Sequence, residues 1–292
     1  MPSSTELITA ILSGLGIGGL FAVAALGLSL VFGVMRLINL AHGELIVLGA
    51  YLAYSLTQWI GVDPLLSIVI VAPAAALVAY PLQRWGLTPV MSKGAEAPLL
   101  ITFGVSVVLQ NLFILVYTPD VRSLSASYSQ ANFTIGGITI PVIYVITLVV
   151  GIVLLYATHL VVTRTGFGRQ IRAGSEDPAA AGMMGVNVRR MYAWTFAVAA
   201  GSAAVAGILV ALAFSFAPSA GTAYLITGFA VVVLGGIGSI KGTLIGGLLL
   251  GVIQSIGATF VGDGWRVFIG CAVVLIVLSI RPQGLFGATE GN

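Results

Sequence analysis

Long apolar runs separated by short polar segments dominate the chain. Eight runs meet or approach the roughly 20 apolar residues that a membrane-spanning helix needs. They cover residues 7–34, 43–60, 64–83, 97–117, 141–163, 191–215, 224–258 and 264–280. The pattern predicts an all-α polytopic integral membrane protein with about eight transmembrane helices. The first run is much longer than a signal-peptide core and is expected to remain as a span.

The run 224–258 is too long for one simple span. It contains the stretch GGIGSIKG, where glycines and Lys241 predict a break into two pieces. The sequence is therefore compatible with nine membrane crossings and with eight crossings that include a broken or re-entrant element.

The amino-acid composition further restricts the class of protein. Hydrophobic residues make up 59% of the 292 residues and charged residues only 7%, against roughly 25% charged residues in a soluble domain. We therefore expect one transmembrane domain over residues 1–292 and no water-soluble domain. The net charge of +3 is interpreted as arginine in cytoplasmic loops, not as a nucleic-acid surface. With one cysteine, Cys271, and no cluster of metal ligands, no disulfide, metal or cofactor is expected.

The distribution of arginine predicts the orientation. Cytoplasmic loops of membrane proteins are enriched in Lys and Arg, and the 164–190 connection holds five arginines, so we place it in the cytoplasm. The 118–140 loop, the uncharged 216–223 loop and the N-terminus then lie outside. If 224–258 crosses twice, Lys241 and Arg281 are inside, which favours nine crossings. Within the outer loop, FTIGGITI alternates around a Gly-Gly pair and predicts a small hairpin.

Polar groups interrupt the apolar sequence at MRLINLAHGELIVLGAYL, residues 35–52. Charged groups inside a bilayer cost several kcal/mol and usually face protein or water at functional positions. We interpret Arg36 as an anchor at the cytoplasmic rim. Asn39 and His42 are three residues apart and are expected to cap or line a break between two helices. Glu44 completes this candidate substrate-pathway cluster.

A second glycine-rich break, GGIGSIKGTLIGG, contains Gly238, Lys241 and Gly242. Paired glycine-interrupted segments in two halves of a chain indicate the central site of a transporter, so these residues are included as pathway candidates. Two unrelated glycine-containing loops are the alternative. For the glycines recurring every fourth position from Gly238 to Gly246, close helix packing is favoured over ligand contact.

The centre of the 164–190 loop predicts a short helix. Asp177 can cap it, Pro178 suits its first position, and Met183 and Met184 are exposed beside small residues. Such a helix fits a groove on a partner protein or rests on the inner leaflet.

The chain shows no readable nucleotide site or catalytic constellation. In GSIKGT the lysine precedes the glycine, unlike a phosphate-binding loop, so ATP hydrolysis would have to occur on another chain. His42 and Glu44, two residues apart, point away from each other on a helix. The protein is predicted not to be an enzyme; a proton-coupled carrier using Glu44 stays open.

Three stretches together resemble the LivH-type permeases of branched-chain amino acid ABC transporters: GLSLVFGVMRLINLAHGELIVLGAYLAY, GFGRQIRAGSEDPAAAGMMGVNVRRMYAWTFAVAAG and VVLGGIGSIKGTLIGGLLLGVIQ. Ala180, Ala181 and Gly185 also resemble the importer motif of two alanines before a glycine. The resemblance implies a helix that couples to an ATPase, with these expected members: Glu176, Asp177, Ala180, Ala181, Met184 and Gly185.

The resemblance also implies partners: a second, LivM-like permease subunit, two cytoplasmic ATPase subunits and an external solute-binding protein. It implies that the chain is a multi-pass protein of the cell inner membrane. Branched-chain amino acids are the expected substrate. A urea or short-amide ABC permease is the alternative within the family, and an ion-coupled secondary transporter is the alternative from another class.

Overall fold

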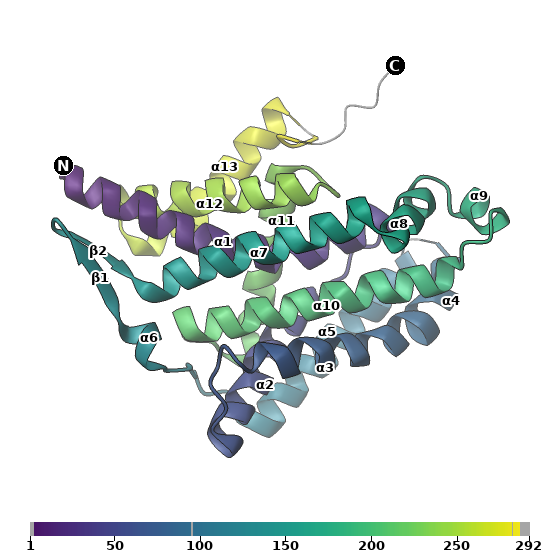
Figure 1. Ribbon diagram of the computed structural model, residues 1–292, viewed down its shortest axis with the longest axis horizontal. Coiled ribbons are helices and arrows are strands. Elements are labelled where there is room, and N and C mark those ends of the chain that lie inside the picture. Colours follow the sequence, from purple (N-terminus) through teal and green to yellow (C-terminus); the bar gives the residue numbers. More distant parts are fainter. Residues whose placement is uncertain (1–2, 95, 282, 287–292) are drawn as a thin grey trace.

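The computed structural model describes residues 3–94, 96–281 and 283–286. Most of its long helices run along the longest axis of the molecule, with the N-terminus at one end and helices α8 and α9 at the other (Figure 1). The long helices are α1 (Ser4–Met35), α2 (His42–Ile60), α3 (Ile68–Pro81), α5 (Glu96–Tyr117), α7 (Val142–Arg164), α10 (Val188–Ala213), α11 (Gly221–Gly235), α12 (Ile240–Val261) and α13 (Arg266–Ile280).

Shorter elements connect these helices. The helix α3 continues through a π-helical segment, Leu82–Leu87, into α4 (Thr88–Met91). The remaining short elements are α6 (Ser127–Gln130), β1 (Asn132–Ile135), β2 (Ile138–Pro141), α8 (Gly166–Glu176) and α9 (Pro178–Met183). The strands β1 and β2 pair antiparallel around Gly136 and Gly137, both with positive φ, which confirms the predicted hairpin.

The prediction of an all-α membrane protein is confirmed. Eight helical segments of the described residues are long and apolar enough to cross a membrane. The helix α2, with 19 residues, is a further long helix outside those eight, and it carries His42, Glu44 and Gln58.

The long run 224–258 forms two helices. It breaks between Gly235 and Ile240, where Gly236 and Gly238 have φ of 98° and 77°. The side chain of Ser239 then caps α12 by accepting from the backbone N–H of Gly242 at 3.0 Å. Because α11 and α12 are separate helices, the described part of the chain agrees with the interpretation as two segments.

Glycine allows α1 and α12 to pack backbone to backbone. A Cβ on Gly18 would lie 2.6 Å from Cα of Leu248, and one on Gly14 would lie 2.7 Å from Cα of Val252. Gly33, near the other end of α1, faces Gly238, so the two helices run antiparallel. The favoured packing interpretation of the glycine repeat is therefore confirmed.

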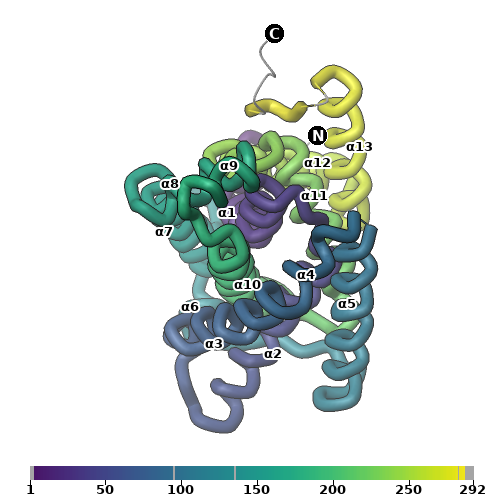
Figure 2. The backbone as a smooth tube through the Cα atoms, turned by 90° about the vertical axis from the view of Figure 1, so that its right-hand side faces the viewer, coloured from purple at the N-terminus to yellow at the C-terminus, as the bar shows by residue number. Residues whose placement is uncertain are grey.

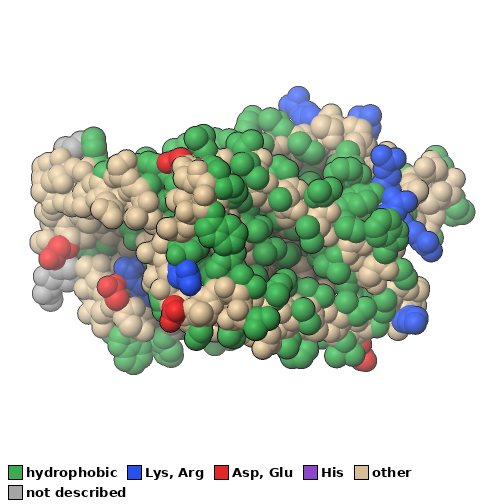
Figure 3. All heavy atoms as spheres, turned by 90° about the horizontal axis from the view of Figure 1, so that it is seen from below, with side chains coloured by type: hydrophobic (Ala, Val, Ile, Leu, Met, Phe, Trp, Pro, Cys, Tyr) green, Lys and Arg blue, Asp and Glu red, His purple; other side chains and the backbone are tan. Residues whose placement is uncertain are grey.

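The helices α1 and α10 form the centre of the bundle, whereas α5 and α13 lie at its rim (Figure 2). The outward faces of the rim helices are apolar: Leu115 is 83% exposed and Val267 is 69% exposed. Most Lys and Arg side chains gather at the end that carries α8 and α9, as Figure 3 shows. This distribution matches the cytoplasmic placement of the 164–190 connection.

Candidate functional site

The polar stretch after α1 forms a tight break inside the bundle. Arg36 ends α1 in the left-handed conformation, with φ of 50°. The chain then turns back, because His42 contacts Ala24, eleven residues before the end of α1 and therefore about 16 Å back along its axis. The helix α2 thus begins among buried residues and not at the end of the bundle.

Two side chains hold this break. Oδ1 of Asn39 accepts a hydrogen bond from the backbone N–H of Ala41 at 3.1 Å. Nε2 of His42 lies 2.8 Å from the carbonyl oxygen of Ala24, so we assign the ring proton to Nε2. Asn39 is 1% exposed and His42 is fully buried. Both residues therefore line the break between α1 and α2, as expected, although neither side chain caps α2; a role in transport remains a prediction.

The helix α5 supports the break from the side. The hydroxyl of Thr102 accepts from the backbone N–H of Leu40 at 3.3 Å. This contact satisfies a half-buried donor in the connection between α1 and α2, which has no intrahelical partner.

The start of α2 meets the start of α11. A Cβ on Gly43 would overlap the carbonyl oxygen of Gly221, and a Cβ on Gly221 would overlap the carboxylate of Glu44. Glu44 is 2% exposed, and its Oε2 has no hydrogen-bond partner among the described residues. Two helix N-termini, each carrying a partial positive charge, therefore converge on one buried carboxylate.

The chain reaches Gly221 by a second re-entrant segment. After α10 ends at Ala213, Phe216 pairs with Arg122 of the 118–126 loop through two backbone hydrogen bonds of 2.8 Å. Phe216 is 2% exposed and packs against Tyr51, with ring centroids 5.0 Å apart. A short 3-10 turn, Pro218–Ala220, then leads into α11. The 216–223 segment, which the arginine distribution places outside, is therefore not a surface loop, because Phe216, Pro218 and Gly221 are buried; its placement on the outer side stays a prediction.

The two re-entrant units are arranged in opposite directions. The helix α1, its break and α2 form one unit; α10, its break and α11 form the other. Gly27 of α1 faces Ala199 and Ser202 of α10, and the two helices run antiparallel in Figure 1. Two antiparallel units with buried breaks are the kind of arrangement from which transporters with inverted repeats build a central site.

The structure does not bring Gly238, Lys241 and Gly242 to this site. Gly238 packs on Gly33 near the end of α1, Gly242 packs on Gly235, and Lys241 is exposed. The segment that pairs with the first break is 214–221, which sequence reasoning missed. The one available signal was Pro218 in an uncharged stretch between two apolar runs.

The centre of the inner connection forms the expected short helix, α9, and a second helix, α8, precedes it. Oδ1 of Asp177 caps α9 by accepting from the N–H groups of Ala179 and Ala180 at 2.8 and 3.0 Å, which confirms the predicted cap. Gly185 ends the turn with φ of 86°. Met183 and Met184 are 84% and 86% exposed.

The helix α9 and the turn through Gly185 form a projection that we call the α9 knob. The other expected members of the coupling helix lie around it. Glu176 and Asp177 are exposed, Ala180 is half-buried and Ala181 is 4% exposed. The preceding helix α8 packs on α10, where a Cβ on Gly174 would lie 2.6 Å from Cε of Met191.

A family model described as the branched-chain amino acid transport system permease component matches residues 10–278. The chain belongs to this permease family. It is therefore a permease subunit, not an enzyme, and a multi-pass protein of the inner membrane; permeases of this family are components of ABC importers.

Relatives match over nearly the whole chain. The high-affinity branched-chain amino acid transport system permease protein BraD of Pseudomonas aeruginosa is 31% identical, over 99% of each chain. LivH of Escherichia coli K12, with the same description, is 29% identical over 95% of this chain and 94% of its own. The fructose import permease protein FrcC of Rhizobium meliloti is 29% identical over 83% of this chain and 69% of its own. No solved structure matches the chain.

Proposed function

We propose that this chain carries branched-chain amino acids across the inner membrane as one of two permease subunits, the other being LivM-like. Two cytoplasmic ATPase subunits supply the energy, and an external solute-binding protein delivers the substrate. Full-length similarity to BraD and LivH supports the substrate class. The capped and exposed α9 is the single structural observation that carries the ATPase-driven mechanism.

The α9 knob has the features of a docking element. Asp177 fixes its start and Gly185 fixes its end, while Met183 and Met184 point away from the bundle. Methionine side chains adapt to a partner groove because they are long, unbranched and polarisable. We assign Glu176, Asp177, Ala180, Ala181, Met184 and Gly185 to the contact with the ATPase.

The helix α10 links this knob to the central break. It follows α9 directly and contacts α8 through Met191. Farther along, its Gly207 packs so closely on α2 that a Cβ would overlap the carbonyl oxygen of Ile46. A displacement of α9 on ATP binding would therefore shift α10 against α2 and α11. Because packed interfaces switch between discrete arrangements, this shift would open one side of the central site and close the other.

At the central site, Asn39, His42 and Glu44 are assigned to the substrate pathway. Helix N-termini attract carboxylate groups, and Glu44 occupies the two N-termini here. Opening of the contact between Gly43 and Gly221 would free these N–H groups for the carboxylate of an amino acid.

Reconstitution of the complete importer tests the proposal. Proteoliposomes with both permeases, the ATPases and the binding protein should accumulate leucine, isoleucine and valine with ATP and not without it. Uptake of urea in place of these amino acids would refute the substrate. Uptake by the permeases alone under an ion gradient would refute the ATPase-driven mechanism and indicate a secondary transporter.

A further inference from the structure

A polar pocket and an apolar crevice adjoin each other at the end of the bundle that carries α9. The pocket, of about 370 Å³, lies between α8 and the start of α10. The crevice, of about 160 Å³, lies between α7 and α10, which run side by side in Figure 1. Phe167 lines both hollows, so they share a wall.

The pocket presents hydrogen-bond donors and one positive charge. Its polar side chains are those of Gln170, Asn187, Arg190 and Trp194. Oδ1 of Asn187 accepts from the backbone N–H of Arg190 at 3.0 Å, so the NH2 group of Asn187 is available as a donor. In the residues that the structure describes, no carboxylate lines the pocket and the guanidinium of Arg190 has no hydrogen-bond or ion-pair partner. This lining fits a phosphate, which accepts hydrogen bonds and is negatively charged.

The crevice is apolar and opens to the outer face of the bundle. Val161 of α7 and Val198 of α10 are 43% and 42% exposed at its rim, whereas Ile171 at its floor is 5% exposed. The hydroxyl groups of Thr158 and Thr195 donate to carbonyl oxygens of their own helices, so they ask for no polar partner from a ligand. An apolar groove on a membrane-spanning surface suits a hydrocarbon chain.

The helix α10 joins the two hollows in the order in which a phospholipid is built. Arg190, Trp194 and Val198 follow one another at four-residue spacing and are all exposed. They therefore lie along one face, with a rise of about 6 Å from each to the next. Tryptophan is enriched at the level of the lipid headgroups. The phosphate, the glycerol and an acyl chain of one lipid thus match Arg190, Trp194 and the crevice in turn.

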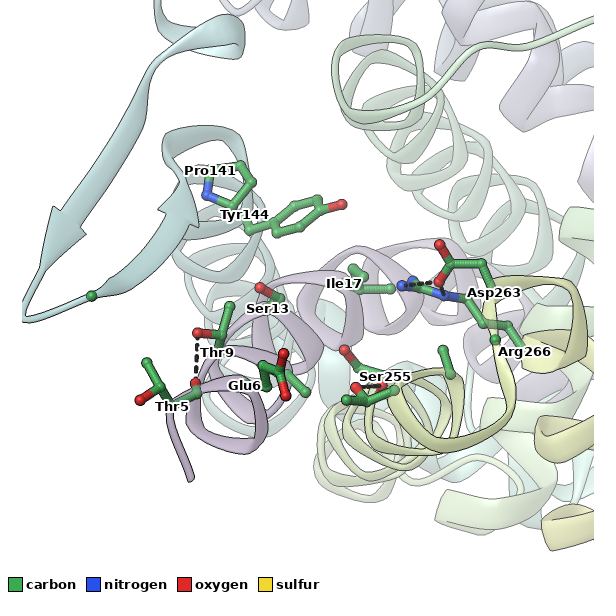
Figure 4. Close-up of a pocket in the computed structure, with 15 residues that line it drawn as sticks. Thr5, Glu6, Thr9, Ser13, Ile17, Pro141, Tyr144, Ser255, Asp263 and Arg266 are labelled. Atoms are coloured by element: carbon green, nitrogen blue, oxygen red, sulfur yellow. Dashed lines mark hydrogen bonds and ion pairs between the residues drawn. The ribbon is translucent and has the colours of Figure 1, made fainter. Parts of the chain in front are cut away.

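The polar pocket at the opposite end of the molecule, of about 500 Å³, differs in its charges (Figure 4). Glu6, Asp263 and Arg266 line it, and Arg266 is paired with Asp263 at 2.9 Å. Its guanidinium is therefore neutralised, and its carboxylates repel a phosphate. The charge of Arg190 is not neutralised in this way, so an anionic group is favoured at the α9 end.

We propose that the pocket and the crevice together bind one anionic phospholipid of the inner leaflet, with its phosphate at Arg190 and an acyl chain between α7 and α10. Basic pockets between helices on the cytoplasmic side are typical sites for such headgroups. A zwitterionic lipid fits less well, because its ammonium group meets no carboxylate among the described lining residues. Gly185 of the α9 knob also lines the pocket, so the lipid lies beside the proposed ATPase contact. The site does not depend on which substrate is transported.

The test measures lipid binding to the full-length permease, purified with the subunits that accompany it. Native mass spectrometry compares phosphatidylglycerol, phosphatidylcholine with the same acyl chains, and glycerophosphoglycerol, which is the headgroup without chains. We expect phosphatidylglycerol to bind about fivefold more tightly than phosphatidylcholine, the factor expected for one arginine at a membrane surface. The soluble headgroup should bind much more weakly, because it leaves the crevice empty.

A photo-activated group on the acyl chain of phosphatidylglycerol locates the lipid. Covalent adducts are expected within residues 157–162 and 195–198, which line the crevice.

Variants connect the binding to the two hollows. Arg190→Gln removes the charge, and the affinity for phosphatidylglycerol should fall about fivefold while that for phosphatidylcholine stays the same. Arg189→Gln is the matched control and should bind normally, because its side chain points about 100° away around the helix and does not line the pocket. Ala157→Phe fills the crevice from an exposed position and should lower both the affinity for phosphatidylglycerol and the yield of adducts.

Several outcomes would overturn the site. These are equal affinity for the two lipids, a soluble headgroup that binds as tightly as the lipid, equal affinities of the Arg190→Gln and Arg189→Gln variants, or adducts confined to other segments. Labelling of the crevice only after removal of the ATPase subunits would show that protein covers the site, and would also overturn it. The melting temperature of each variant shows whether it is folded; Ala157→Leu replaces Ala157→Phe if the larger side chain is not tolerated.

Discussion

The central break and the inner knob both depend on glycine, but for opposite reasons. At the break, Gly43 and Gly221 are in contact, and a Cβ on either would overlap its neighbour. At the knob, Gly185 has open space around it and is required by its φ of 86°. The first pair allows two helices to meet, whereas Gly185 only shapes a turn. The bundle is therefore constrained most strongly where it is buried, and the knob is free to engage another protein.

The largest expected effect is at the break. Gly221→Val would force a side chain into the carboxylate of Glu44, and overpacking of a tight contact costs about 3 kcal/mol. We expect a lower yield of folded protein and a clearly lower melting temperature in detergent. Gly182→Val, in open space on α9, is the control and should melt like the wild type. Equal melting of both variants would refute the contrast between the two regions.

The second-largest expected effect is a loss of transport in a variant that still folds. Gly185→Asp places a side chain at positive φ, which costs about 1–3 kcal/mol locally, and adds charge to the proposed ATPase contact. Leucine uptake by the reconstituted importer should be abolished while the amount of permease in the membrane stays normal.

The control for this variant carries the same strain elsewhere. Gly61→Asp is also at positive φ, 75°, with open space around it, but lies at the end of α2. Its uptake should be retained. Normal uptake by Gly185→Asp would contradict the assignment of α9.

The smallest expected effect comes from the side chains that hold the first break. Asn39→Ala with His42→Ala removes two buried hydrogen bonds, each contributing about 1 kcal/mol. We expect a modest loss of stability and a changed KM for leucine. The control Ser55→Ala removes one hydrogen bond, to Tyr117, from the same helix. Unaltered kinetics in the double variant would leave these residues with a structural role only.

The sequence allowed prediction of those features that depend on the length of an apolar run or on a local helix cap. The long spans, the division of 224–258 and the cap at Asp177 follow from local rules that act within a few residues. The entry of the 214–221 segment into the bundle does not, because hydropathy reports how apolar a segment is and not how deep it lies. The contact of Gly43 with Gly221 was also invisible, since glycine marks turns, close packing and flexible loops alike.

The prediction that the stretch around Gly238 matches the first break was wrong for a related reason. Gly238 and Lys241 belong to a glycine-rich stretch that looks like a second broken helix, yet this stretch is the ordinary turn between the antiparallel helices α11 and α12. The matching segment lacks charge and carries its information in Phe216, whose burial depends on Tyr51 and Arg122 from distant parts of the chain.

The central claim is that α9 contacts an ATPase subunit. Cross-linking from α9 tests this claim most directly. On a Cys271→Ser background, Met183→Cys is labelled with a photo-activated cross-linker in the assembled, transport-competent importer. The account predicts a covalent adduct with an ATPase subunit from this position and none from Trp59→Cys at the end of α2, where the side chain is 78% exposed. An active importer that gives no ATPase adduct from Met183→Cys, or equal adducts from both positions, would contradict it.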